Sequence, residues 1–169
     1  MAVVSAPLSR QARRLHSIEF ASGTLPLQED KITIRDAESS DAPELAVLMR
    51  ELGYETKQAE MESRLKLILS NPAHKTFVAI MDGRVCGMIG TLTYTSYEHI
   101  LALVTLSEAR QRGIGRALIA TAEKDFAQRG IRRVALDTRL TREDAHKFYE
   151  SLGYERNGWR FVKQLPVSD

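Results

Sequence analysis

The stretch that decides the fold runs from Arg110 to Leu118 and reads Arg-Gln-Arg-Gly-Ile-Gly-Arg-Ala-Leu, between a short apolar run and a helical stripe. Gly113 and Gly115 lack side chains, so a ligand can approach their backbone closely. The first turn of the helix that follows has unpaired N–H groups and carries the positive end of the helix dipole. Together these features predict a cradle for an anion such as a pyrophosphate.

A glycine pair of this kind is also typical of a flexible turn, so other phosphate motifs have to be compared with it. The phosphate loop G-x-x-x-x-G-K-[ST] is absent from the chain. The dinucleotide fingerprint needs a third small residue at position 118, where the chain has Leu118. Asp137 follows Gly115 by 22 residues, near the spacing of the acidic residue in that fingerprint, but the order of elements does not fit a doubly wound sheet.

Arginine is concentrated around this stretch. Between Arg110 and Arg142 there are nine basic and three acidic residues, whereas the whole chain of 169 residues has a formal net charge of +2. A nearly neutral chain does not favour general nucleic-acid binding. The cluster therefore predicts a compact phosphate-bearing ligand, although a solvated helix face would have the same composition.

Length and cysteine usage restrict the class of protein. A chain of 169 residues predicts one domain, and Cys86 as the single cysteine excludes an internal disulfide and a multi-cysteine zinc site. Every apolar run falls short of the ~18 residues of a membrane span, and the N-terminus lacks a secretory apolar stretch. We therefore expect a cytoplasmic protein without a metal and with neither nucleic acid nor membrane among its partners.

Hydrophobic periodicity predicts an α+β fold, with a single domain over residues 31–169 after an N-terminal tail over residues 1–30. Strands are predicted over residues 32–36, 76–81, 85–95, 100–106, 133–137 and 160–165. The run 100–106 is nearly all apolar, so we expect that strand to be buried on both faces. Helices are predicted between an N-cap at Asp41 and Gly53, and over residues 58–69, 115–129 and 143–152.

Two motifs on these elements resemble the GNAT superfamily of acyl-CoA-dependent N-acetyltransferases. They are the family's phosphate motif, [QR]-x-x-G-x-[GA], and a later signature, A-x-x-x-Y-x-x-x-G-[FY]. The chain matches the two motifs at Arg110, Gly113, Gly115, Ala145, Tyr149, Gly153 and Tyr154. It departs from the family at Thr105-Leu106-Ser107, where V-x-P is usual, and at Arg142, where asparagine is common.

The resemblance implies a GNAT-like fold, in which a mixed central sheet of about six to seven strands is flanked by about four helices. In that fold the sheet splays between its fourth and fifth strands, and acetyl-CoA lies in the gap as cosubstrate. The resemblance places the cofactor-binding contacts at Leu103, Val104, Thr105, Arg110, Gln111, Arg112, Gly113, Ile114, Gly115, Arg116, Ala117, Arg142, Ala145 and Tyr149.

The implied reaction is attack of an amine on the thioester carbonyl, which needs an acid for the thiolate and a base for the ammonium. Tyr149 matches the family position of the acid, although its place on an apolar stripe also suits a core tyrosine. Glu98 and His99 are the candidate bases, with a water chain as the alternative. By strict alternation His99 shares a face with Leu101, Leu103 and Thr105, and Glu98 lies on the other face.

The sequence therefore predicts an N-acetyltransferase that moves an acetyl group to a primary amine of a small-molecule or peptidyl acceptor. A catalytically silent acyl-CoA-binding module is the alternative, because it would keep the same cradle. The acceptor itself stays open. Its walls are expected from the first two predicted helices, the loop around residues 53–58 between them and the connection around residues 93–98. Tyr54, Glu55, Tyr94 and Tyr97 in these segments are able to bind a cation, but they are equally typical of an ordinary surface. A homodimer is common in the family and is a further option.

Overall fold

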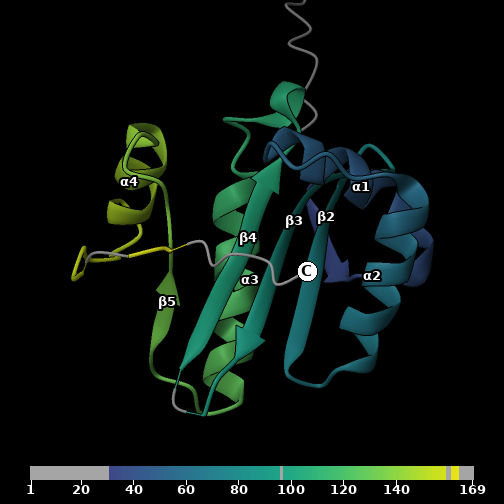
Figure 1. Ribbon diagram of the computed structural model, residues 1–169. Coiled ribbons are helices and arrows are strands. Elements are labelled where there is room, and N and C mark those ends of the chain that lie inside the picture. The colour runs from purple at the N-terminus through teal and green to yellow at the C-terminus, as the bar shows by residue number, and fades with distance from the viewer. Residues whose placement is uncertain (1–30, 96, 159–160, 164–169) are drawn as a thin grey trace, which may run out of the picture.

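The computed structural model describes residues 31–95, 97–158 and 161–163, and these residues form an α+β fold around one mixed sheet (Figure 1). The strands lie side by side in chain order and are β1 (Thr33–Asp36), β2 (His74–Met81), β3 (Arg84–Thr93), β4 (Glu98–Thr105) and β5 (Val134–Leu136). The helices are α1 (Ala42–Glu51), α2 (Gln58–Ser70), α3 (Ile114–Gln128) and α4 (Glu143–Glu150). The predicted fold class and the four helices are confirmed.

The first four strands form the predicted antiparallel meander, and β5 then pairs with β4 in parallel. Asp82 and Gly83 make the turn between β2 and β3 with φ of 53° and 75°. Two successive positive φ values are typical of the two-residue turns that match the twist of a hairpin. The β4-to-β5 connection runs through α3, because parallel neighbours need a crossover.

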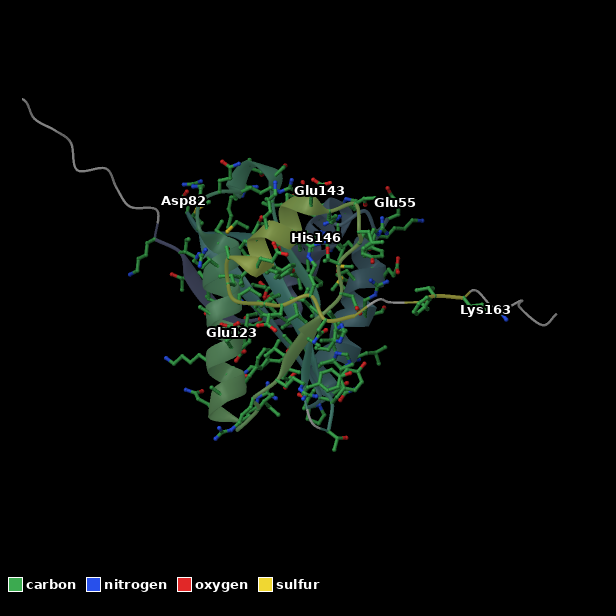
Figure 2. All side chains as sticks on the ribbon, turned by 90° about the vertical axis from the view of Figure 1, so that its left-hand side faces the viewer. Glu55, Asp82, Glu123, Glu143, His146 and Lys163 are labelled. Carbon is green, nitrogen blue, oxygen red and sulfur yellow. The ribbon has the colours of Figure 1, made fainter. Side chains whose placement is uncertain are left out.

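Helices cover both faces of the sheet. Figure 2 views the sheet from its β5 edge, with α3 on one face and α1 and α2 on the other. The apolar stripe of α3 includes Leu118, Ala122 and Phe126, which are all at most 1% exposed. Burial of such side chains is the main stabilising contribution of this core, at about 1.5–3 kcal/mol for each large one. The short α4 stands beside β5 (Figure 1).

Asp41 immediately precedes α1 as predicted, but its side chain does not cap that helix. Both carboxylate oxygens accept hydrogen bonds of 2.7 Å from the Arg35 guanidinium, and one also accepts the Glu38 N–H at 2.8 Å. Asp41 therefore closes a 3₁₀ turn at Ser39–Asp41 and ties it to β1. The bond to Arg35 holds the pKa of the Asp41 carboxyl below its ordinary value, against the opposing effect of burial.

The expectation of six to seven strands is wrong for the described residues, which contain five. The sixth predicted strand covers residues 160–165, of which the structure describes Phe161–Lys163, and these three form no strand. Phe161 and Val162 are 93% and 78% exposed. Alternation of apolar residues makes a strand only when a sheet edge pairs with it and one face is buried, and these residues have neither. The remaining residues of that prediction lie outside the described part.

The sheet opens between β4 and β5, as the resemblance implies. The two strands pair only at Glu98↔Val134, His99↔Ala135 and Ile100↔Leu136, while β4 continues to Thr105. Above this fork the strands diverge (Figure 1). The expectation that the 100–106 run is buried on both faces is wrong, because Leu101 is 52% exposed. Within this run Ile100 and Val104 are buried in the core, and Leu101 is exposed at the cleft.

Candidate active site

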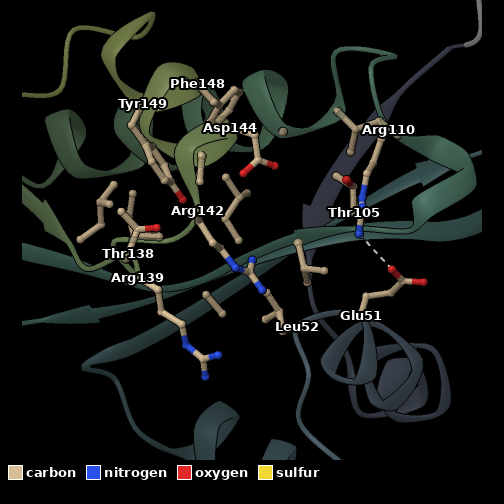
Figure 3. A pocket seen from close by; sticks show the side chains of 18 of the residues that line it. Glu51, Leu52, Thr105, Arg110, Thr138, Arg139, Arg142, Asp144, Phe148 and Tyr149 are labelled. Atoms are coloured by element: carbon tan, nitrogen blue, oxygen red, sulfur yellow. Dashed lines mark hydrogen bonds and ion pairs between the residues drawn. The ribbon is translucent and has the colours of Figure 1, made fainter.

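A cleft of about 750 Å³ occupies the gap between β4 and β5. One wall is the β4 segment from Ile100 to Thr105, and the other is the end of β5 with the loop into α4. The turn before α3 closes one end of the cleft, and the end of α1 contributes Glu51 and Leu52 (Figure 3). The cleft therefore brings together three segments that are far apart in the sequence.

The turn before α3 has the geometry of an anion cradle. Gln111 and Gly113 have positive φ values of 60° and 81°, and Gly113 is the N-cap of α3. The first turn of α3 has no acidic residue and no side-chain cap within the described residues. The N–H groups from Gly113 to Arg116 have no acceptor inside the helix, whereas that of Ala117 is bonded to the Gly113 carbonyl. These donors and the helix dipole favour an anion.

Gly115 leaves room in the cradle that a side chain would fill. A Cβ at this position would lie 3.4 Å from Cζ of Phe148 on α4, which is a tight contact. The glycine therefore lets α4 pack against the first turn of α3 while the backbone stays open. The sequence indicates that Gly115 lets a ligand approach the backbone. In the structure Gly115 also lets Phe148 pack closely against the first turn of α3.

The arginines around the cradle differ in the groups with which they interact. The Arg110 guanidinium lies 3.0 Å from Oε2 of Glu51 at the end of α1, as the dashed line in Figure 3 shows. The Arg116 guanidinium is 3.4 Å from the Ser151 hydroxyl and also lines the cleft. Arg112 and Ala117 do not line it. All other predicted cofactor-binding residues line the cleft, so the structure gathers twelve of the fourteen in one place.

The edge of β4 that faces the cleft suits an extended ligand. From Ala102 to Thr105, β4 pairs with β3 on one side and with no described strand on the other. Such an edge offers backbone N–H and C=O groups to an amide-bearing chain, as in β-strand addition. An edge that leads to a helix N-terminus fits the pantetheine arm and pyrophosphate of acyl-CoA, so the residues present fit that group.

Tyr149 lies on the α4 wall, and its hydroxyl points into the cleft (Figure 3). Its ring packs edge-on against Phe148 and Tyr154, with centroids 5.2 and 5.7 Å apart. Burial raises the pKa of the Tyr149 hydroxyl, and the positive charge of Arg142 opposes part of that change. The hydroxyl is therefore protonated at neutral pH and able to donate a proton. Tyr149 therefore packs against neighbouring aromatic rings and also lines the cleft.

Glu98 lies away from the cleft, on the α3 face of the sheet. It is fully buried, and its Oε1 lies 2.6 Å from both the Arg129 guanidinium and the Thr93 hydroxyl. Its Oε2 is buried without a hydrogen-bond partner among the described residues. Arg129 caps the C-terminal end of α3, so this carboxylate ties β4 to that helix.

His99 lies on the opposite face from Glu98 and does not line the cleft. Its Nε2 is 3.4 Å from Oδ2 of Asp137, which does line it. The prediction that His99 shares a face with Leu103 and Thr105 is wrong. Leu101 is an extra residue opposite the Gly90–Thr91 bond, and this bulge reverses the alternation.

The register shows the consequence of the bulge. His99 pairs with Leu92, and after the bulge Ala102 pairs with Gly90 and Val104 with Met88. Leu92, Gly90 and Met88 alternate along β3 and share one face. His99 therefore shares the face of Ala102 and Val104, which is the face covered by α1 and α2.

Sequence analysis missed most of the cleft wall that follows β5. The β5–α4 loop lines the cleft through Thr138, Arg139 and Thr141 in addition to Arg142. No apolar period marks this loop, so only its position between two motif-bearing elements was available as a signal. A second cavity, about 260 Å³, lies under α1 and α2 and shares Leu52, Tyr54, Leu101 and Ala102 with the cleft. Tyr54 is thus placed where an acceptor wall was expected.

Two further features of the described residues bear on the class of protein. No group of three or more histidine, cysteine, aspartate or glutamate side chains is arranged to hold a metal ion in the described part of the chain. None of the helices described is both long and apolar enough to cross a membrane.

The fold and the cleft define an acyltransferase of the CoA-dependent class. The chain belongs to the GNAT acetyltransferase family, because the model of that family matches residues 36–154. An aminoalkylphosphonate N-acetyltransferase of Salmonella typhimurium is 33% identical over 139 residues, which cover 79% of this chain and 88% of the relative. The family predicted from the two motifs is confirmed.

Solved structures support the same assignment. A GNAT family acetyltransferase of Staphylococcus aureus matches with a TM-score of 0.67 and 27% identity, over 79% of this chain and 98% of that one. An aminoglycoside N-acetyltransferase in complex with CoA matches with a TM-score of 0.74 and 19% identity, over 82% of this chain and 97% of that one. At 19% identity, the likeness to the aminoglycoside N-acetyltransferase shows a shared fold alone.

Proposed function

We propose that the chain transfers an acetyl group from acetyl-CoA to a primary amine of a small-molecule or peptidyl acceptor, by direct attack on the thioester. The observation that carries the proposal is the single cleft that joins an open β4 edge, a helix N-terminal cradle and the Tyr149 hydroxyl. Acetyl-CoA supplies an activated acyl carbon, because a thiolate is a fair leaving group.

The cradle and the β4 edge would hold the cosubstrate. The N–H groups from Gln111 to Arg116 suit the pyrophosphate, and Arg116 adds a positive charge at the cleft wall. Backbone groups of Leu103 to Thr105 suit the amides of the pantetheine arm. Ala145 is small enough to let the arm pass beside α4, and it lines the cleft.

Proton transfers complete the reaction. The amine nitrogen forms a bond to the thioester carbon, the C–S bond breaks, and the sulfur leaves with its electron pair. Tyr149 donates its hydroxyl proton to that sulfur, and a base takes the proton that the acceptor ammonium loses. A backbone N–H at the end of the paired part of β4 polarises the carbonyl.

Of the two candidate bases, His99 fits better than Glu98. Both oxygens of Glu98 lie on the α3 face, and one of them is committed to Arg129. His99 lies beside the fork, where Asp137 connects it to the cleft. We infer that the proton from the acceptor reaches His99 through Asp137 or one water.

The names of the relatives point to amine acceptors of different charge. One is an aminoalkylphosphonate N-acetyltransferase and another is an aminoglycoside N-acetyltransferase. A primary amine on a small molecule is common to both, and we carry over that shared feature.

Two variants test the proposal. Gly115→Glu places bulk against Phe148 and a negative charge in the cradle, so CoA binding measured by calorimetry should be lost while the far-UV circular dichroism spectrum is retained. Tyr149→Phe should lower kcat by about 10–100-fold, the low end for general acid catalysis, and leave the Kd of acetyl-CoA within twofold. Unchanged CoA affinity in a folded Gly115→Glu variant would refute the cradle. A Tyr149→Phe variant that melts lower but turns over at the wild-type rate would return Tyr149 to a purely structural role.

A further inference from the structure

The loop between β5 and α4 lines the cleft with hydrogen-bond donors. Its sequence from residue 138 to residue 142 is Thr-Arg-Leu-Thr-Arg. Four of these five residues line the cleft, while Leu140 does not and is 71% exposed. The lining members are two hydroxyls and two guanidiniums, Thr138, Arg139, Thr141 and Arg142. Such a set is suited to the oxygens of an anion.

The two arginines of this loop carry charges that no described residue neutralises through an ion pair. Within the described residues, neither Arg139 nor Arg142 forms an ion pair, although Arg110 is paired with Glu51 and Arg129 with Asp125 and Glu98. Both side chains line the cleft, and in Figure 3 Arg142 points toward Leu52. Their charge is therefore available to a ligand in the cleft.

The cosubstrate does not account for these charges. Its pyrophosphate belongs at the cradle formed by the turn before α3, where Arg110 and Arg116 lie. Its 3′-phosphate is carried by the ribose, which is attached to the pyrophosphate on the side opposite the pantetheine arm and therefore lies away from the fork. The pantetheine arm that would follow β4 from there toward the fork is uncharged. Arg139 and Arg142 lie on the opposite wall of the cleft. Arg142 points toward Leu52, which also lines the second cavity. An anion at this place must come from another molecule.

A carboxylate precedes the same loop. Asp137 lines the cleft directly after the last β5 residue, and its carboxylate is 41% exposed and lies 3.4 Å from Nε2 of His99. The wall thus carries the Asp137 carboxylate at the fork and the guanidiniums of Arg139 and Arg142 further along, with the Asp144 carboxylate of α4 also lining the cleft. A molecule with an ammonium and an anionic group matches both.

We propose that the acceptor is a zwitterionic amine, in which a primary ammonium meets Asp137 and an anionic oxyacid group, such as a phosphonate, sulfonate or carboxylate, meets the loop of residues 138–142. The assignment rests on the proposed acetyl transfer and names the chemical class of its acceptor. It gives Arg142 to the acceptor instead of the cofactor. A diamine or a polycationic amine is disfavoured, because its further charges would face Arg139 and Arg142.

Matched acceptors test the assignment. 2-Aminoethylphosphonate and taurine carry an ammonium and an anion, propylamine carries only the ammonium, and putrescine carries a second cation. We expect kcat/KM for the first two to exceed that for propylamine at least about tenfold, the effect of one charged hydrogen bond. The values are compared per unprotonated amine, because an anionic group changes the pKa of the amine itself. Equal use of propylamine, or a preference for putrescine, would overturn the proposal.

Variants of the loop separate the acceptor from the cosubstrate. Arg139→Gln and Arg142→Gln should each lower the ratio of kcat/KM for the anionic acceptors to kcat/KM for propylamine about tenfold, while the Kd of CoA changes less than twofold. Arg132→Gln is the matched control, because Arg132 is exposed and does not line the cleft. Weaker CoA binding with an unchanged ratio between anionic and neutral acceptors would assign both arginines to the cosubstrate and refute the proposal.

A binding measurement decides the question even without turnover. With CoA saturating, 2-aminoethylphosphonate should raise the Tm of the wild-type chain and of Arg132→Gln, but not that of the Arg139→Gln/Arg142→Gln double variant. Absence of acetyl transfer to every amine would contradict the proposed function, yet this anion-dependent shift would still support the anion site. A shift that is equal in the wild type and the double variant would refute it.

Discussion

Gly87 on β3 should be the least replaceable glycine of the sheet, because it sets the distance between β3 and the first turn of α3. A Cβ at this position would lie 2.9 Å from Cγ2 of Ile114, 3.1 Å from the Val104 carbonyl oxygen and 3.2 Å from Cδ1 of Leu118. The first distance is shorter than real side chains show, and the second involves backbone that cannot rotate away. Gly87→Ala therefore requires α3 to move outward or Ile114 to leave its rotamer.

Forced overpacking of this kind costs about 1–3 kcal/mol of unfolding free energy. For a domain of this size 1 kcal/mol corresponds to roughly 3 °C in Tm, so we expect a drop of about 3–9 °C. Ile114 is the first residue of α3, so the same displacement should disturb the cradle and weaken CoA binding.

Gly90→Ala is the matched control in the same strand. Its added Cβ would meet only the Thr76 hydroxyl, at 3.8 Å, which is an ordinary contact. Thermal denaturation of both variants, with calorimetric titration of CoA, compares the two positions directly. If Gly87→Ala and Gly90→Ala melt at the same temperature and bind CoA equally, the close packing of β3 on α3 does not position the cradle.

Two other predictions concern charged side chains. Asp41→Asn should lower the free energy of unfolding by about 2–3 kcal/mol at pH 7, the range for charged hydrogen bonds at a partly buried site. Because the pKa of Asp41 is lowered in the folded state, its contribution is present above the unfolded pKa and is lost as pH falls through the folded value. Urea denaturation at pH 7 and at pH 3 should thus show the variant and wild type converging at low pH; a constant difference would contradict the Arg35–Asp41 pair as its origin. Glu98→Gln should cost about 1–3 kcal/mol by weakening the bond to Arg129, while kcat stays within threefold. A loss of kcat above a hundredfold at unchanged Tm would instead make Glu98 the base.

The sequence alone identified the elements and the cradle, because both depend on local rules. Apolar spacing of about 3.6 residues located all four helices, and the turn between the strands predicted over residues 76–81 and 85–95 lies at Asp82 and Gly83. Gly113 and Gly115 marked the cradle because an open backbone before a helix is itself a local property. The two motifs, together with the order of these elements, were enough to indicate the family.

Only the tertiary structure decided which side chains face the cleft. Alternation failed at His99 because the extra residue at Leu101 depends on how β4 pairs with β3, and no residue type announces that bulge. The burial of Glu98 and its ion pair with Arg129, 31 residues further along the chain, are not indicated by the sequence around Glu98. The hydrogen-bond donors of the β5–α4 loop lie on one wall of the cleft because β4 and β5 diverge. Contacts between segments far apart in the chain arise from packing, so the local sequence does not indicate them.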